Sequence, residues 1–137
     1  GLPRTEDALA QVAQRQDARA ADALIARLKD QDFRVREAAI QALAQVAASG
    51  DERAVAAASA QLETSDVLDM QDRVRCAAVE ALGQLARRGH QRTLVGVIAQ
   101  LDREWYVRCR ALRTLGQVAQ KGDRRVIATL IGRLEDE

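Results

Sequence analysis

Hydrophobic residues recur along the chain at the three- and four-residue spacing of helices that bury one face. One stretch carries two such stripes in succession: Val74, Ala78, Leu82 and Leu85, and then Leu94, Val97, Ile98 and Leu101. Gly89 lies between the stripes, and glycine is favoured where a helix ends in a positive φ. The pattern therefore predicts a helix, a turn at Gly89 and a second helix that runs back along the first.

This helix–turn–helix pattern occurs several times. The segments FRVREAAIQALAQVAASGDERAV, DRVRCAAVEALGQLARRGHQRTL and WYVRCRALRTLGQVAQKGDRRVI begin at Phe33, Asp72 and Trp105, and each has a glycine at the turn. A fainter copy lies upstream, where Leu9, Gln11, Val12 and Ala13 match Leu43, Gln45, Val46 and Ala47. Such self-similarity is typical of repeat proteins and divides residues 1–137 into units of about 1–31, 32–70, 71–103 and 104–137.

The repeat predicts an all-α domain, an α-solenoid of four antiparallel helix pairs. Because one pair cannot bury its apolar stripes alone, the pairs must stack on one another. The chain is 47% hydrophobic but only 2% aromatic, and its only proline is Pro3, which suits helices packed closely over small side chains. We expect Asp17, Asp51 and Asp123 to cap the second helices, with His90 in that place in the third unit.

Units that combine Val-Arg near the start, a central Leu-Gly and Gly-Asp-x-Arg at the turn resemble HEAT repeats, particularly the short HEAT-like repeats of bilin lyase subunits. The resemblance covers nearly the whole chain. It implies a right-handed solenoid whose second helices line a concave face, and a role mainly as a scaffold. It also implies that the arginine after the recurrent valine joins a ladder between units. These arginines are Arg36, Arg75 and Arg108, with Asp32 and Glu104 as candidate acidic partners.

Two departures from a regular repeat stand out. The connection over residues 63–73 is longer than the others and contains Val67, Leu68 and Met70, which either carry function or cover the seam between units two and three. At the chain ends, the first helix is expected to be short and to begin near Pro3. The last apolar stripe, which includes Ile127, has no unit after it. We therefore expect a segment of a longer array, or end-to-end self-association.

The sequence offers no constellation for catalysis, and we expect no enzyme activity, cofactor or metal. Cys76 and Cys109 occupy equivalent positions, which places them too far apart for a disulfide, and we expect two free, buried thiols. His90 is the only histidine, too few for a zinc site. The net charge of +1 and the lack of an apolar run of about 20 residues indicate a soluble intracellular, cytoplasmic protein that does not insert into membranes.

A binding surface is predicted along the outward side of the second helices. There, small residues are flanked by arginine and glutamine, so a partner helix or peptide could approach closely; a solvated face without a ligand is the alternative. Lys and Arg also outnumber Asp and Glu in units three and four, and several gather at the turns. The candidate partner-binding residues are Arg27, Arg53, Gln61, Arg92, Gln100, Arg103, Arg125 and Arg133 on the strip, and Arg88 and Arg124 on the edge formed by the turns.

Three functions fit these observations. The leading hypothesis is a protein-interaction scaffold that binds a helix or peptide on the second-helix face, with the basic edge attracting acidic partners. The second is binding of nucleic acid or another phosphate backbone by that edge, although only Trp105 and Tyr106 are large enough rings to stack on bases within the basic units. The third, from the resemblance, is a catalytic or non-catalytic subunit of a bilin lyase.

Overall fold

The computed structural model describes residues 5–64, 70–120 and 123–135, with side chains described up to residue 132. Seven α-helices and one short 3₁₀-helix follow one another in this part of the chain. They are α1 (Thr5–Arg27), α2 (Phe33–Val46), α3 (Glu52–Leu62), α4 (Gln71–Leu85), α5 (Gln91–Ala99), η1 (Gln100–Asp102), α6 (Trp105–Val118) and α7 (Arg124–Glu135).

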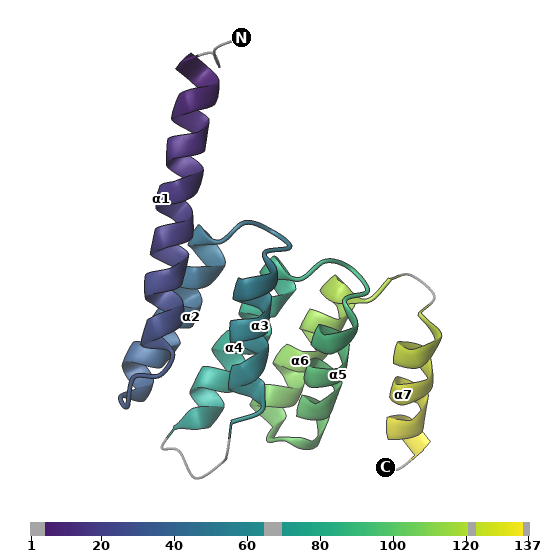
Figure 1. Ribbon diagram of the computed structural model, residues 1–137. Coiled ribbons are helices and arrows are strands. Elements are labelled where there is room, and N and C mark those ends of the chain that lie inside the picture. Colours follow the sequence, from purple (N-terminus) through teal and green to yellow (C-terminus); the bar gives the residue numbers. More distant parts are fainter. Residues whose placement is uncertain (1–4, 65–69, 121–122, 136–137) are drawn as a thin grey trace.

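The helices form two layers (Figure 1). The first helices of the pairs lie side by side, with α2 packed on α4 and α4 on α6. The second layer holds α1, α3 and α5 in the same order, and α7 ends the row. Each layer advances by one helix per repeat, so the apolar side of one pair is covered by the next. The predicted all-α solenoid of stacked helix pairs is confirmed.

The core lies between the two layers and runs the length of the stack. The predicted stripe of α4, from Val74 to Leu85, is buried throughout, and on α5 Leu94 and Val97 are buried as well. Full burial of a side chain such as Leu94 stabilises the folded state by roughly 1.5–3 kcal/mol relative to leaving it exposed. Because the core consists largely of Ala, Val and Leu from neighbouring repeats, its stability comes from the contacts between pairs.

The glycine turns connect successive repeats by backbone hydrogen bonds. Gly50 and Gly89 have positive φ angles of 81° and 78°. The N–H of Gly50 donates to the carbonyl of Leu85 at 2.6 Å, and that of Gly89 donates to Val118 at 2.7 Å. Leu85 and Val118 are the last residues of α4 and α6, and the last carbonyls of a helix receive no hydrogen bond from an N–H group within that helix. Each turn therefore satisfies a free carbonyl of the following repeat.

The predicted caps of three second helices are confirmed. The carboxylate of Asp51 accepts hydrogen bonds from the backbone N–H groups of Arg53 and Ala54 at the start of α3. His90 accepts the N–H of Thr93 through Nδ1 at 3.3 Å, and Asp123 caps α7 in the way that Asp51 caps α3. A histidine thus replaces the aspartate cap in the third unit, as expected.

The prediction for the first unit was wrong. Asp17 does not start a second helix, because α1 is one continuous helix of 23 residues and not a short helix followed by a turn. The position that holds Gly50 in the second unit is held here by Gln16, which lacks the freedom of glycine to adopt a positive φ. The part of α1 before Ala21 consequently extends beyond the stack and is exposed (Figure 1).

The recurrent arginines bind mainly to the connections between repeats. Arg36 is buried, and its Nη1 donates to the carbonyls of Asp30 at 2.8 Å and Gln31 at 2.9 Å. Its Nη2 reaches Oε1 of Gln71 in the next repeat at 3.3 Å. Arg75 is 1% exposed and donates to the carbonyl of Thr64. Each of these two side chains holds the loop that precedes its own helix.

The acidic partners differ from those expected. The carboxylate of Asp72 accepts a hydrogen bond from Arg75 at 2.8 Å, whereas that of Asp32 binds Arg34, whose hydrogen bonds lower the pKa of Asp32. Arg108 is exposed, and the structure describes no side-chain contact between it and Glu104. Among the described contacts the ladder therefore ends at Arg75.

Only part of the long connection is described. Val67 and Leu68, expected to cover the seam between units two and three, lie outside the described residues. Met70 is described and has a φ of 53°, an uncommon conformation for a residue with a side chain. Met70 is 46% exposed, so it is only partly covered by its neighbours.

We expect Gly89→Ala to destabilise the fold by about 1–2 kcal/mol, since its φ is positive and a Cβ would lie 2.9 Å from the side chain of Gln120. Gly116→Ala is the matched control: a Cβ there meets nothing within 4 Å inside α6, and alanine should stabilise the helix by up to about 1 kcal/mol. Urea denaturation of both variants measures the two free energies of unfolding. Equal effects of the two substitutions would contradict the role of the turn.

The arginine ladder predicts unequal effects at equivalent positions. Arg75→Ala should lower the free energy of unfolding by about 2–3 kcal/mol, because it removes a buried side chain and the donor to the part-buried Thr64 carbonyl, while Asp72 keeps its hydrogen bond from Tyr106. Arg108→Ala removes an exposed side chain and should change stability by less than about 0.5 kcal/mol. Thermal and urea denaturation compare the two variants; similar losses would show that burial of Arg75 is not what matters.

Candidate functional site

The outward side of the second helices presents small side chains. Ala23 and Ala26 of α1, Ala60 of α3 and Ala99 of α5 are all exposed. They lie opposite the buried stripes of the same helices, so stacking itself turns them outward. A surface floored by methyl groups allows the backbone of a bound helix or peptide to come close.

Three arginines of this surface contact the preceding second helix. Nη1 of Arg53 lies 2.6 Å from Asp22 on α1, and Nη1 of Arg125 donates to Gln91 on α5 at 2.7 Å. Nη2 of Arg92 lies 3.8 Å from Glu63 after α3. All three are exposed, and exposed pairs of this kind contribute little to stability. These arginines can therefore exchange their internal partners for an external one at small cost.

The remaining predicted strip residues lie in different environments. Arg27 is exposed and Gln61 is partly exposed. Gln100 is buried and donates to the carbonyl of Gly96 at 3.2 Å, so its assignment as a contact residue was wrong: the chain turns into η1 at this point and directs the amide inward. The side chain of Arg133 lies outside the described residues.

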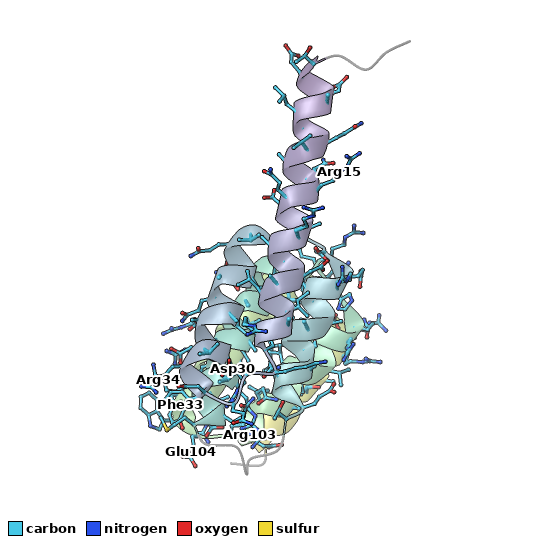
Figure 2. The ribbon with its side chains drawn as sticks, turned by 60° about the vertical axis from the view of Figure 1, so that its left-hand side comes forward. Arg15, Asp30, Phe33, Arg34, Arg103 and Glu104 are labelled. Atoms are coloured by element: carbon cyan, nitrogen blue, oxygen red, sulfur yellow. The ribbon has the colours of Figure 1, made fainter. Side chains whose placement is uncertain are left out.

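Arg103 belongs to a different surface from the turn arginines. It follows η1 and is partly exposed beside Glu104, where the chain passes from one repeat to the next. Figure 2 shows Arg103 and Glu104, like Phe33 and Arg34, on the side of the stack away from the projecting part of α1. Arg15 lies on that projecting part. We call the side with Arg103 the connection edge, defined by residues 70–75 and 102–108.

The opposite side, the turn edge, carries arginines from two successive turns. Arg87, Arg88 and Arg124 are exposed there. Arg87 lies over Gly50, where an added Cβ would approach its Nε to 2.6 Å, and Nη1 of Arg88 donates to the carbonyl of Ala119 at 3.0 Å. Within the described part of the chain, none of the three forms a salt bridge with a carboxylate. Their charge is therefore directed to solvent.

The connection edge contains a cavity of about 900 Å³ that sequence reasoning missed. It is lined by residues that start α4 and α6, among them Met70, Arg73, Trp105 and Tyr106. The length of the connection before α4 was the available signal. Its lining mixes acidic and basic side chains, since Asp72, Asp102 and Glu104 also border it. This mixture does not favour one class of charged ligand.

Trp105 lies at this edge, in the position that Phe33 holds in its repeat. Its match to Phe33 predicts packing between repeats, yet the indole is 67% exposed. Its ring contacts Tyr106 edge-to-face, with centroids 5.8 Å apart. Phe33, by contrast, lies under the guanidinium of Arg73 in the next repeat, 5.4 Å from the ring centroid. Trp105 is thus exposed because no described repeat supplies the matching arginine.

Both cysteines are free, as predicted, but only one is buried. Cys76 lies inside the stack, where burial raises the pKa of its thiol. Cys109, its equivalent in the last repeat, is exposed, so the prediction of two buried thiols was wrong at this position. Among the described residues no group of three His, Cys, Asp or Glu side chains is placed to hold a metal ion.

The two thiols should therefore react at very different rates. With N-ethylmaleimide near neutral pH we expect rapid alkylation of Cys109, while Cys76 reacts only slowly because its thiol is covered and its thiolate disfavoured. Mass spectrometry of tryptic peptides over time measures both rates in the same sample, and unfolding in urea should make them similar. Equal rates in the folded protein would contradict the burial of Cys76.

The comparisons with known proteins agree with this geometry. A family model described as HEAT repeats matches residues 6–70 and 65–137, which together include nearly every helix of the stack. No curated protein matches the chain. Within the described residues, no helix combines the length and apolar character needed to cross a membrane. The continuous match and the stacked helix pairs show that the chain belongs to the family of HEAT-repeat proteins.

Proposed function

We propose that this protein is a scaffold module that binds an acidic helix or extended peptide along the face of its second helices. HEAT repeats generally mediate protein interactions and are typically non-catalytic. The finer part of the proposal rests on one observation: the exposed alanines lie toward the C-terminal ends of α1, α3 and α5, and α5 and α7 begin at a turn edge whose arginines have no described carboxylate partner.

The two surfaces have complementary roles in this proposal. The alanine floor, for example Ala60 and Ala99, provides close van der Waals contact without specificity of charge. Arg87, Arg88 and Arg124 provide a positive field that favours acidic partners during encounter. These arginines have no described internal salt bridge to break before they pair with a carboxylate of the partner. Arg53, by contrast, must first break its salt bridge with Asp22.

Nucleic-acid binding is a weaker candidate on the same surface. The aromatic rings that could stack on bases, Trp105 and Tyr106, begin α6 at the connection edge. Arg88 is next to Ala119 at the other end of that helix. The 14 residues of α6 separate the two sites by about 20 Å. One nucleotide of a single strand therefore could not contact both the aromatic rings and Arg88. A role as a subunit of a bilin lyase is supported only by the resemblance of the sequence.

Reversal of charge at the turn edge tests the proposal. We expect Arg87→Glu with Arg124→Glu to weaken binding of an acidic amphipathic helical peptide at least about tenfold, mainly through a slower association rate at low salt. A second peptide with the same apolar face and a basic polar face should bind poorly to the native chain. Surface plasmon resonance at several salt concentrations measures the rates.

The matched control changes the net charge equally but away from that edge. Arg15→Glu with Arg108→Glu should leave binding of the acidic peptide within about twofold, because Arg15 is exposed on the projecting part of α1 and Arg108 is exposed on the connection edge. Equal loss in both double variants would mean that only net charge matters and would overturn the proposed site. If a DNA duplex binds more tightly than the acidic peptide, with a steep salt dependence, the phosphate-backbone function is favoured instead.

A further inference from the structure

The last helix pair exposes positions that the earlier pairs bury. Leu112 on α6 is 50% exposed, while its repeat equivalent, Val79 on α4, is 0% exposed. Ile127 on α7 is 47% exposed, against 0% for the equivalent Leu94 on α5. The two buried residues are covered because another helix pair packs against them. The outer side of α6 and α7 therefore has the shape and chemistry of an interface between repeats without its second half.

A groove runs between α6 and α7 on this side. Its volume is about 340 Å³, and its walls are mainly apolar. The lining residues include Leu112, Leu115, Gly116, Val126, Ile127 and Leu130. Gly116 has open space where a Cβ would stand, which lets a neighbouring backbone approach α6 closely. A groove of this kind fits one amphipathic helix with two or three apolar anchors.

The other end of the same chain carries such a helix. The projecting part of α1, residues 5–16, keeps the repeat pattern of a first helix, in which Leu9 corresponds to Leu43. Leu43 is fully buried, whereas Leu9 is 65% and Val12 is 47% exposed. The two anchors are three residues apart and so lie on one side of α1. This segment is a repeat-type first helix without a described helix pair to pack on.

We propose that the projecting part of α1 docks in the α6–α7 groove of a second copy, so that copies associate head to tail. Leu9 and Val12 of one copy would then contact Leu112 and Ile127 of the next, which extends the existing packing of α4 on α6 by one more helix. The interface continues an arrangement already present within the chain.

Charge supports this pairing of ends. The projecting part of α1, residues 5–16, carries two acidic residues, Glu6 and Asp7, in its first turn and one basic residue, Arg15, so its net charge is −1. Beside the groove, Arg113 follows Leu112 and Arg124 begins α7, and both arginines are exposed. Asp123 also lines the groove, but its carboxylate caps α7. Opposite charges at the two ends favour head-to-tail contacts, whereas tail-to-tail contacts would bring arginines together. The contact is asymmetric, so it does not close on itself in a dimer and can add further copies.

Association should be weak and dependent on concentration, because one short helix in a groove lies at the small end of specific interfaces. Sedimentation velocity of the native chain over a range of concentrations should show a rising weight-average mass. Leu9→Glu with Val12→Glu removes the helix anchors, and Leu112→Glu with Ile127→Glu removes the groove anchors. Each double variant alone should be monomeric. All four side chains are exposed, and circular dichroism verifies that both variants keep their helices.

The mixture of the two double variants is the decisive sample. The groove variant still has an intact helix and the helix variant an intact groove, so the mixture should form a one-to-one dimer and nothing larger. Val95→Glu, at an exposed apolar residue of α5 outside both surfaces, should associate as the native chain does. A native chain that stays monomeric at high concentration, a helix variant that still associates, or a mixture that stays monomeric would each overturn the proposal. None of the substituted residues belongs to the turn edge, so these variants keep the arginines proposed to attract the acidic peptide.

Discussion

The structure depends on one constraint: a single helix pair cannot bury its own apolar stripes. Each pair is covered by the next, and the buried side chains of α4 are the clearest case, since α2 packs on one side of this helix and α6 on the other. Hydrogen bonds repeat the same arrangement, because the N–H of Gly50 satisfies the end of α4 and that of Gly89 satisfies the end of α6. Stability is thus a property of neighbouring pairs and is lowest at the ends.

Much of this fold is predictable from the sequence because its determinants are local. Glycine turns, aspartate caps and apolar stripes lie at fixed spacing, and Asp51 and His90 have the expected roles. The continuous α1 could have been recognised from Gln16 in the place of a glycine. Cys109 and Arg108 are exposed because no described segment from elsewhere in the chain packs against their side chains. The pattern of residues within one repeat does not reveal such long-range packing.

The candidate site shows a similar division. Placement of arginines on the second helices and at the turns follows from the repeat, but their partners do not. Asp22 and Gln91 engage Arg53 and Arg125 through stacking of consecutive repeats, while Arg88 meets only a backbone carbonyl. The burial of Gln100 depends on the 3₁₀ turn after α5, which no spacing rule indicates. These differences between equivalent residues give a repetitive scaffold its distinct surfaces.

Amide hydrogen exchange at low protein concentration tests most directly whether stability comes from covering each pair with the next. The account predicts the strongest protection in α4, which is packed on both sides, weaker protection in α7, and little in the part of α1 before Asp17. Protection that follows helix length instead, with the 23-residue α1 as stable as α4 along its whole length, would contradict it.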